Sequence, residues 1–508
     1  MSSSLIQRDA VNNNLLDQID VLQQRVARLE RYALLEIPPE SIYKVRDYGA
    51  VGDGVTNDTA AIQAAWDAMS NGDALWFEPG KTYLVADTLL FNNNLTFVTV
   101  YGNAARIEVD ASADMTGKPV INLAGSAYVN WYDLRISAPD DTTPPVVGLL
   151  LGRTSTFHGS RQGFYNALIS GYFTFAAYYN VGSEVSSFHK CTFENYESGG
   201  HAAYISNDDI QSLLDLDSGQ LTGTYVNCVF HCFGSDPAKN IYMRGAVSDQ
   251  VFVGCYGVVS PGGHFIYTED GDGSNGMISN QFKGIRIEAG NEDHTDSRIF
   301  YQNNASATCG DFKFENIQFA GPATNAPEYH YEIVKAISKC SFATTNNFYG
   351  KTMLIKSTAT VNDCEVKGNG TNQVTVESGA TMTGNRFLWT RGDYPFDATP
   401  SGMNLAQFCP ELIGSLVNFS DGDTTPSVGG GRFFKTNNTN PTTITDFDDA
   451  VPGVMFYVLS GDFNTTLDFS GTNLKGNNGV DYTLVYPDMV RVVPLAGSTY
   501  KYCEIIQA

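Results

Sequence analysis

Short segments that alternate apolar and polar residues recur through the middle of the chain. Fragments such as FHKCTFENY, YVNCVFHCF, VFVGCYGVV and AISKCSFAT follow one another between about residues 160 and 390. Alternation over four to eight residues predicts half-buried β-strands, and Gly or Asn between them predicts turns. Because one unit is repeated, we expect successive copies to stack on each other and share a continuous core.

A Cys or Asn at a comparable place in each copy gives the length of the repeat. Most intervals between these residues are 21 to 27 long, and they are Cys191, Cys228, Cys255, Asn280, Asn316, Cys340, Cys364 and Asn385. Three short strands with their turns fit this length, so the pattern predicts an all-β fold, a three-sided right-handed parallel β-helix. Rungs then lie about 4.8 Å apart, and like residues stack on like. We interpret the cysteines as buried thiols of one such ladder and the asparagines as its amide members.

Residues 1–37 have a different period. Apolar residues are spaced alternately four and three apart, at Leu15, Ile19, Leu22, Val26, Leu29 and Ala33. This heptad spacing predicts an α-helical coiled-coil stalk, and continuing it backwards places the polar Asn12 in the same seam. The alternative is an amphipathic helix that lies on its own domain. Pro38 and Pro39 end the helix in either case.

After about residue 390 the repeat is lost, and a different pattern begins near Arg432. Short apolar segments such as VMFYVL, TTLDFSG and MVRVVPL are separated by turn residues every eight to twelve positions. This spacing predicts a small antiparallel, sandwich-like β domain. We therefore divide the chain into a stalk (1–37), a cap with the first rungs (38–110), a β-helix body (111–410) and a C-terminal β domain (411–508).

The most specific motif follows the two prolines. The segments KVRDYGAVGDGVTNDTAAIQAAWDAM (44–69) and ALWFEPGKTYLV (74–85) resemble the N-terminal signature of pectate-lyase-superfamily β-helix proteins, which is common in phage tailspikes. Its glycines permit a tight positive-φ loop, and the amphipathic helix after it can cover the open end of a solenoid. The C-terminal run TNNTNPTTITDFDDAVPG resembles modules of phage fibres that close the trimer or bind the receptor.

The resemblance implies a homotrimeric tailspike and a set of partners. Its N-terminus would dock on the phage tail, the baseplate or an adaptor protein, and its substrate would be a host surface polysaccharide. The net charge of −24 disfavours nucleic acid and membrane partners, because an acidic surface repels phosphate groups. We find no signal-peptide core, no apolar run of about 18 residues and no zinc spacing of Cys and His. We therefore expect a virion protein assembled in the host cytoplasm, without a metal or cofactor.

Catalysis by such a protein needs acidic side chains that project from neighbouring rungs. Hydrolysis of a glycosidic bond uses two carboxyl groups, one as acid and one as base or nucleophile. The candidate catalytic residues are the carboxylates that follow or end strands of the repeat, namely Asp208, Asp209, Glu269, Asp270 and Glu288. Each could instead solvate a turn. A polysaccharide lyase would need a base and a cation instead, and Lys and Arg are sparse.

Aromatic side chains supply the second line of evidence, because their rings bury the flat C–H faces of sugars. The candidate substrate-binding residues are Tyr178 with its neighbour Tyr179, Tyr204, Tyr267, Tyr329, Tyr331 and Trp389, together with His264 and Arg286. Alternate aromatics in a β-helix can also be core stacks. The leading hypothesis is a tailspike that recognises and hydrolyses host polysaccharide. A non-enzymatic glycan-binding adhesin and a polysaccharide lyase are the alternatives.

Overall fold

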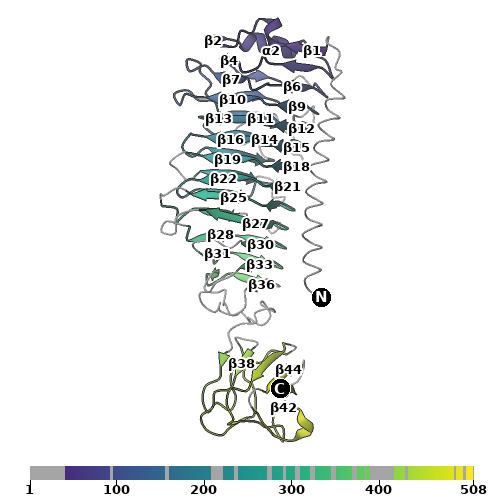
Figure 1. The fold of residues 1–508 in the computed structure, drawn as a ribbon, viewed down its shortest axis with the longest axis vertical. Coiled ribbons are helices and arrows are strands. Elements are labelled where there is room, and N and C mark those ends of the chain that lie inside the picture. Colours follow the sequence, from purple (N-terminus) through teal and green to yellow (C-terminus); the bar gives the residue numbers. More distant parts are fainter. Residues whose placement is uncertain are drawn as a thin grey trace.

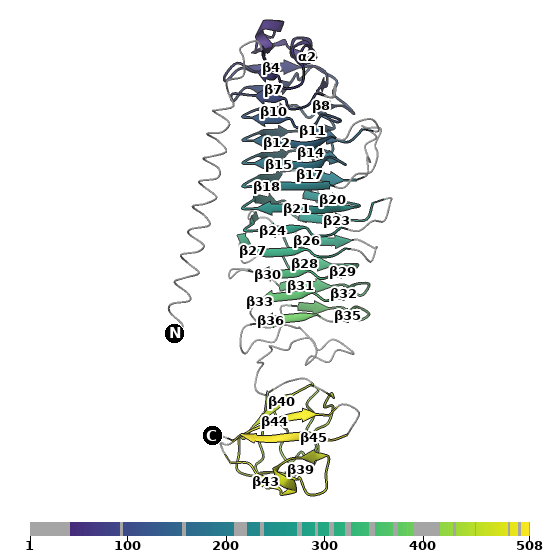
Figure 2. The same cartoon turned by 90° about the vertical axis from the view of Figure 1, so that its right-hand side faces the viewer.

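Stacked parallel strands form a long column that winds around one axis (Figures 1 and 2). The computed structural model describes residues 41–506, except for 92–94, 155–158, 208–220, 234–237, 272–276, 290–292, 304–308, 321–326, 345–350, 369–373, 384, 390–416, 430–432, 453, 486–487 and 496–498. The predicted stalk, residues 1–37, lies outside this range. Every strand pair from β1 to β36 is parallel, as the sequence pattern predicts for a β-helix.

The strands lie on three faces, named A, B and C in the order in which the chain visits them after β11. Face A holds β1 (Ile42–Lys44), β3 (Ala74–Trp76), β6 (Thr99–Tyr101), β9 (Asn130–Tyr132), β12 (Ser160–Tyr165), β15 (Glu184–His189), β18 (Leu221–Val226), β21 (Val247–Val253), β24 (Gln281–Lys283), β30 (Ser341–Thr344), β33 (Glu365–Gly368) and β36 (Arg386–Trp389). Face B holds β2 (Asp53–Asn57), β4 (Thr82–Val85), β7 (Arg106–Val109), β10 (Arg135–Ala138), β13 (Leu168–Gly171), β16 (Thr192–Asn195), β19 (Val229–Cys232), β22 (Tyr256–Val259) and β25 (Arg286–Ala289). The long strand β27 (Lys313–Ala320) pairs with β24 on face A and with β25 on face B.

Face C is a single eleven-stranded sheet. It holds β5 (Leu89–Leu90), β8 (Pro119–Asn122), β11 (Val147–Gly152), β14 (Ala176–Val181), β17 (His201–Ser206), β20 (Lys239–Arg244), β23 (His264–Glu269), β26 (Arg298–Asn303), β28 (Tyr329–Ile333), β31 (Lys351–Ile355) and β34 (Val374–Val376). A three-stranded sheet joins the last rungs, formed by β29 (Ala336–Ser338), β32 (Thr360–Asn362) and β35 (Thr381–Thr383).

The corner between faces A and B is a tight turn built on a left-handed residue. One such residue occupies this corner in successive rungs, with φ between 53° and 63°, at Asn166, Lys190, Asn227, Gly254 and Gly284. Only Gly adopts this conformation without strain, and Asn tolerates it better than most residues. The turn keeps consecutive strands in register, so every rung presents equivalent positions to the same face.

Aromatic rings form a continuous stack inside the column, under face A. Centroids of successive rings are 4.4 to 6.1 Å apart along Trp131, Phe164, Phe188, Tyr225, Phe252, Phe282, Phe314 and Phe342. All eight side chains belong to one buried core cluster that runs through the described rungs. This stack is the physical result of the repeat, because parallel in-register rungs place like side chains above like.

The eight cysteines that the structure describes are buried free thiols, as predicted, but those of the repeat form two ladders rather than one. Cys191, Cys228 and Cys255 stack at the corner between faces A and B, and each thiol donates to a carbonyl of the preceding rung at 3.4 Å. Cys340 and Cys364 belong to a second ladder, at the corner before face A, which begins at Asn280. The single ladder predicted from the repeat is therefore wrong, because inward positions at two different corners recur at the same interval along the chain.

A short helix covers the end of the column where the described chain begins. Helix α2 (Thr59–Asp67) buries Ile62, Ala65 and Trp66, and the Trp66 ring stacks on Phe91 at 4.3 Å. The 3-10 turn η2 (Val45–Tyr48) lies beside it. The glycine loop before the helix is held by the buried Asp58 carboxylate, which accepts bonds from two backbone N–H groups. The motif therefore builds an end cap, as the resemblance implies.

Residues 417–506 form a separate small β unit with its own buried core. One sheet has the order β37 (Val417–Asn418), β38 (Phe433–Lys435), β40 (Phe456–Leu459), β44 (Met489–Pro494), β45 (Lys501–Ile506) and β42 (Leu474–Lys475), and the other holds β39 (Thr442–Ile444), β41 (Thr465–Leu467) and β43 (Tyr482–Thr483), with a 3-10 turn η3 (Asn477–Gly479). The predicted antiparallel pattern holds for β40, β44 and β45 and for the pair of β41 with β43, whereas the other described pairs of this unit are parallel. Strand β38 pairs in parallel with β40, because about twenty residues separate them and allow a crossover.

None of the helices in the described part of the chain is long and apolar enough to cross a membrane.

Candidate functional site

Five tyrosines stack one above another on the outer side of face C. The paired strands β14, β17, β20, β23 and β26 place them directly in register, at Tyr179, Tyr204, Tyr242, Tyr267 and Tyr301. Successive ring centroids are 5.3, 4.6, 4.8 and 5.4 Å apart. We call this set the tyrosine column.

The column is covered at one end and open at the other. Tyr179 and Tyr204 are fully buried in a small apolar cluster with Leu150 and Val181, outside the main core. Tyr242, Tyr267 and Tyr301 are partly exposed. The open part of the column therefore spans three rungs, a rise of about 9.6 Å.

Basic side chains line the edge of the column where the strands of face C begin. Lys239, His264 and Arg298 occupy one register position on successive rungs. The Lys239 ammonium lies 5.4 Å from the ring centroid of Tyr242 and 5.0 Å from that of Tyr267. The His264 ring stacks on Tyr301 at 4.6 Å. Cations over aromatic faces are stabilised by the ring quadrupole, so this edge holds both charge and flat surface.

Polar side chains line the opposite edge, where the same strands end. Arg244, Glu269 and Asn303 share one register position. The Glu269 carboxylate lies 3.4 Å from Arg244 and accepts a hydrogen bond from the Tyr267 hydroxyl at 3.3 Å. Asn303 donates to the same hydroxyl at 3.3 Å. The open tyrosines therefore sit in a frame of hydrogen-bonding groups.

Burial shifts the ionisation of the groups around the column. The pKa of His264 is lowered to about 3 by burial, with smaller effects of Arg298 and Lys239, so the imidazole is neutral at pH 7. Burial raises the pKa of Tyr267 to about 12, which keeps its hydroxyl protonated. Burial also lowers the pKa of Lys239, partly offset by Glu269. The open face thus combines neutral donors and acceptors with a half-buried lysine.

Such a face suits a ligand that is flat on one side and rich in hydroxyl groups. Aromatic rings bury apolar C–H surface, and the hydroxyl, imidazole, amide and carboxylate groups beside them bind polar atoms. Glu269 and Asp270, both partly exposed, are the predicted carboxylates at this edge. Glu332 continues the column two rungs beyond Tyr267, but it is buried and accepts a 2.7 Å bond from Arg298.

Several of the predicted aromatic residues lie inside the protein rather than on its surface. Tyr178 and Tyr331 point into the main core and have no exposed surface, so they cannot contact a substrate. Tyr329 is buried between the cations of Arg298 and Lys351. Tyr204 belongs to the column but is covered. Only His264 and Tyr267 of the predicted binding residues lie in its open part.

Arg286 and Glu288 lie on face B, away from the tyrosine column. Their side chains form an ion pair at 2.6 Å, and the Tyr256 hydroxyl donates to Glu288 at 2.7 Å, which lowers the pKa of that carboxyl. Arg286 was predicted to bind substrate and Glu288 to act in catalysis; both lie on a different face from Glu269, because the tight corner at Gly284 turns the chain onto face B. Asp208, Asp209 and the side chain of Trp389 lie outside the described residues.

The column itself was missed, although its signal is present in the sequence. The strands read AAYYNV, HAAYIS, KNIYMR, HFIYTE and RIFYQN, and Tyr is the fourth residue of all five. Aligning these segments on each other, rather than on the cysteines, would have added Tyr242 and Tyr301 to the candidates. Lys239 and Asn303 would then have followed as their flanking residues.

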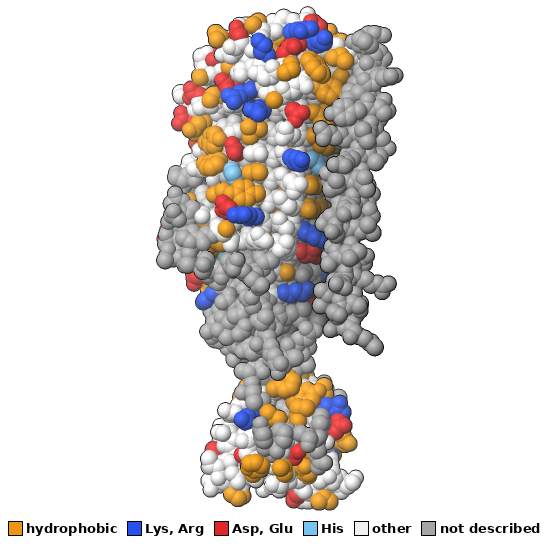
Figure 3. Space-filling view, in the orientation of Figure 1, with side chains coloured by type: hydrophobic (Ala, Val, Ile, Leu, Met, Phe, Trp, Pro, Cys, Tyr) orange, Lys and Arg blue, Asp and Glu red, His pale blue; other side chains and the backbone are white. Residues whose placement is uncertain are grey.

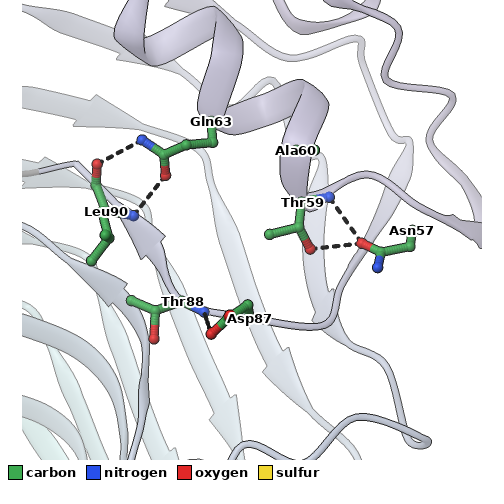
Figure 4. Close-up of a pocket in the computed structure, with 7 residues that line it drawn as sticks. All are labelled: Asn57, Thr59, Ala60, Gln63, Asp87, Thr88 and Leu90. Atoms are coloured by element: carbon green, nitrogen blue, oxygen red, sulfur yellow. Dashed lines mark hydrogen bonds between the residues drawn. The ribbon is translucent and has the colours of Figure 1, made fainter.

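A second hollow lies beside the cap and serves a structural purpose. It has a volume of about 340 Å³ and is lined by Asn57, Thr59, Ala60, Gln63, Asp87, Thr88 and Leu90 (Figure 4). Its polar groups bond to one another, since Gln63 bridges the backbone of Leu90 and Asn57 accepts from Thr59. These bonds fasten α2 to the first rungs.

A known protein family matches part of this chain. Residues 42–137 match the family described as rhamnogalacturonase A/epimerase, pectate lyase-like, in agreement with the resemblance of residues 44–85. No curated protein matches the chain.

Several solved structures are similar to this chain at low sequence identity and with TM-scores below 0.5. ORF18 of Geobacillus virus E2 is 13% identical over 96% of this chain and 78% of its own, with a TM-score of 0.34. PfbA, a surface adhesin of Streptococcus pneumoniae, is 13% identical over 71% and 94%, with a TM-score of 0.40. The phiAB6 tailspike, in complex with oligosaccharides of Acinetobacter baumannii surface polysaccharide, is 16% identical over 55% and 47%, with a TM-score of 0.34.

Proposed function

We propose that this protein is a phage tailspike that binds a host surface polysaccharide along the open part of the tyrosine column. One observation carries the proposal: three partly exposed tyrosines stacked in register within a frame of hydrogen-bonding groups. A polysaccharide is an extended chain, and it can run along the column from rung to rung. The spike is a homotrimer that joins the phage tail, baseplate or an adaptor protein through its N-terminal region.

Binding is tested by removing the open rings one at a time. Tyr242→Ala, Tyr267→Ala and Tyr301→Ala are each expected to weaken binding of host oligosaccharide roughly 5- to 30-fold, about 1–2 kcal/mol, measured by isothermal calorimetry. The matched control is Tyr256→Ala, an outward tyrosine on face B, which should bind as the wild type does. If all four variants bound the oligosaccharide as tightly as the wild type, the tyrosine column would not be the binding site.

The bound glycan is then cut by hydrolysis, with Glu269 and Asp270 at the edge of the column and Asp208 and Asp209 as the second candidate pair. Hydrolysis requires an acid and a base or nucleophile, and Glu269 lies beside the open tyrosines. A non-enzymatic adhesin is the second candidate function. It is favoured by the pairing of Glu269 with Arg244 and of Glu332 with Arg298, since both carboxylates already have a cationic partner.

Cleavage is tested on purified host polysaccharide by the release of reducing ends. Glu269→Gln with Asp270→Asn, and separately Asp208→Asn with Asp209→Asn, identify the catalytic pair as the one whose loss lowers the rate at least 100-fold while binding persists. Products with an unsaturated sugar would show a lyase instead. Tight binding without any shortening of the glycan would establish the adhesin.

A further inference from the structure

Face A carries a second outward row of apolar side chains, distinct from the tyrosine column. Paired strands place its members in one register position on seven successive rungs, at Trp76, Tyr101, Tyr132, Tyr165, His189, Val226 and Val253. The first five rings are 4.9 to 5.8 Å apart, centroid to centroid. We call this row the aromatic stripe. Figure 3 shows hydrophobic side chains interspersed with charged and polar ones on the side of the molecule that faces the viewer.

The stripe lies on the outside of the fold and has a defined end. Its members are only partly buried, and none belongs to the main core cluster. On the next rungs the same register position is taken by Lys283 and Glu315, which form an ion pair at 3.3 Å. An apolar row of this length on one sheet face indicates a packing surface rather than a scatter of exposed residues.

The chain outside the described residues ends at the top of this stripe. The first strand, β1, pairs with β3, and Lys44 lies in register with Trp76. Residues 1–40 therefore join the fold at the cap end of face A. Pro38 and Pro39 precede this junction and disfavour a helix that continues straight into β1. A helix before them is free to turn back along face A.

The length and spacing of the heptad seam match the stripe. From Leu15 to Ala33 a helix rises about 27 Å, at 1.5 Å per residue. Seven rungs span about 29 Å, at 4.8 Å per rung. Seam residues recur every 3.5 positions on average, about 5.2 Å, so nearly one seam residue meets each rung. The seam becomes polar at Asn12, one step beyond Leu15, and the stripe becomes polar at Lys283, one rung beyond Val253.

We propose that residues 15–33 form a helix that packs lengthwise on the aromatic stripe of its own chain. The apolar seam is then buried against Trp76 through Val253 instead of against two partner helices. Of the two predicted arrangements, this is the helix that lies on its own domain rather than the coiled-coil stalk. The aromatic stripe is then the surface on which the helix packs. Subunits of the trimer associate through other surfaces.

Engineered disulfides test this arrangement. Leu22→Cys combined with Tyr165→Cys, or with His189→Cys one rung away, is expected to give an intrachain disulfide under mild oxidation, seen as a faster monomer band on a non-reducing gel. Leu22→Cys with Thr192→Cys is the matched control, because Thr192 lies at the same rung on face B. The eight described native cysteines are buried free thiols.

The other outcomes overturn the proposal. Covalent dimers of the single variant Leu22→Cys would show seam-to-seam contact, as in a coiled coil. A disulfide between chains that needs both cysteines would place the helix on a neighbouring subunit. If no disulfide formed with either Tyr165→Cys or His189→Cys, the helix would not pack on the stripe.

Limited proteolysis gives a second measurement on folded protein. Trypsin cleavage after Arg25 and Arg28 should accelerate at least 10-fold in Tyr132→Asp/Tyr165→Asp, a change on the stripe that leaves residues 1–40 intact. The control Thr192→Asp/Val229→Asp, on the outer side of face B, should be cut at the wild-type rate. Unchanged cleavage of the stripe variant, with its β-sheet circular dichroism intact, would contradict the docked helix.

Discussion

Whether a tyrosine of this protein lies in the core or on the surface depends on a shift of one residue. Tyr178 and Tyr179 are neighbours in β14, yet the first enters the main core and the second begins the tyrosine column. Side chains alternate across a strand, so adjacent residues meet different environments. Composition alone treats the two as equal, whereas only Tyr179 belongs to the surface that continues to Tyr267.

Two buried histidines make the stability of the folded protein depend on pH. The pKa values of His201 and His264 are lowered to about 3, chiefly by burial, so the folded chain binds fewer protons than the unfolded chain below pH 6.5. Their contribution to stability is complete above pH 6.5 and is lost progressively as the pH falls toward 3. Between pH 7 and pH 5, each histidine should lower the free energy of unfolding by about 2 kcal/mol.

The measurement is the unfolding temperature at pH 7 and at pH 5. His264→Gln should show a smaller drop between the two values than the wild type. The lowered pKa of Glu194, about 2 beside His231, acts in the same direction but only below its unfolded value of about 4.5. An identical drop in wild type and variant would show that His264 is protonated in the folded state.

At the scale of the element, the corner between faces A and B repeats the left-handed backbone conformation from rung to rung. Gly284 has φ of 63°, and a Cβ there would meet no atom closer than 3.8 Å, so the backbone angle alone requires glycine. Lys190 adopts φ of 55° at the equivalent corner. A left-handed conformation costs a residue with a Cβ about 1–2 kcal/mol.

We therefore expect opposite effects from two substitutions at this corner. Gly284→Val should lower stability by about 1–2 kcal/mol or more, because valine is also β-branched. Lys190→Gly should leave stability unchanged or raise it by up to about 1 kcal/mol, since released strain is partly offset by chain entropy. Urea unfolding followed by circular dichroism measures both. A stable Gly284→Val would mean that the corner can change its turn.

At the scale of the whole molecule, the β-helix and the C-terminal unit have separate cores. Every described member of the second core lies between residues 419 and 503, whereas the main core ends at Val374. The boundary predicted at residue 411 falls outside the described residues. The division predicts that each part keeps its fold when the other is removed.

A chain shortened to residues 1–410 tests this division. It should retain the β-sheet signal of the full protein and bind oligosaccharide with the same affinity, because the tyrosine column lies in β14 to β26. It should also lose the trimer, if the C-terminal unit closes the assembly as the resemblance to fibre modules implies. Light scattering measures the mass. Collapse of the β-sheet signal would show that the C-terminal unit is needed to fold the column.

Much of the architecture was encoded in patterns that need no tertiary information. The repeat predicted parallel stacked rungs because each rung uses the same positions for core and turn. The motif of residues 44–85 predicted the cap, since its glycine loop and amphipathic helix are local features. The eight described cysteines were correctly predicted to be buried, but the two ladders were merged, because a repeat length does not say which corner a residue occupies.

The face on which each outward residue lies was decided by the tertiary structure alone. Glu288 lies only 19 residues after Glu269, but the tight corners of the rung carry it to a different face. Tyr179 and Tyr301 are 122 residues apart and belong to one column, because five strands stack in register. The sequence determines which residues can face outward through alternation and turn chemistry. Which of them meet is determined by the winding of the chain around a common axis.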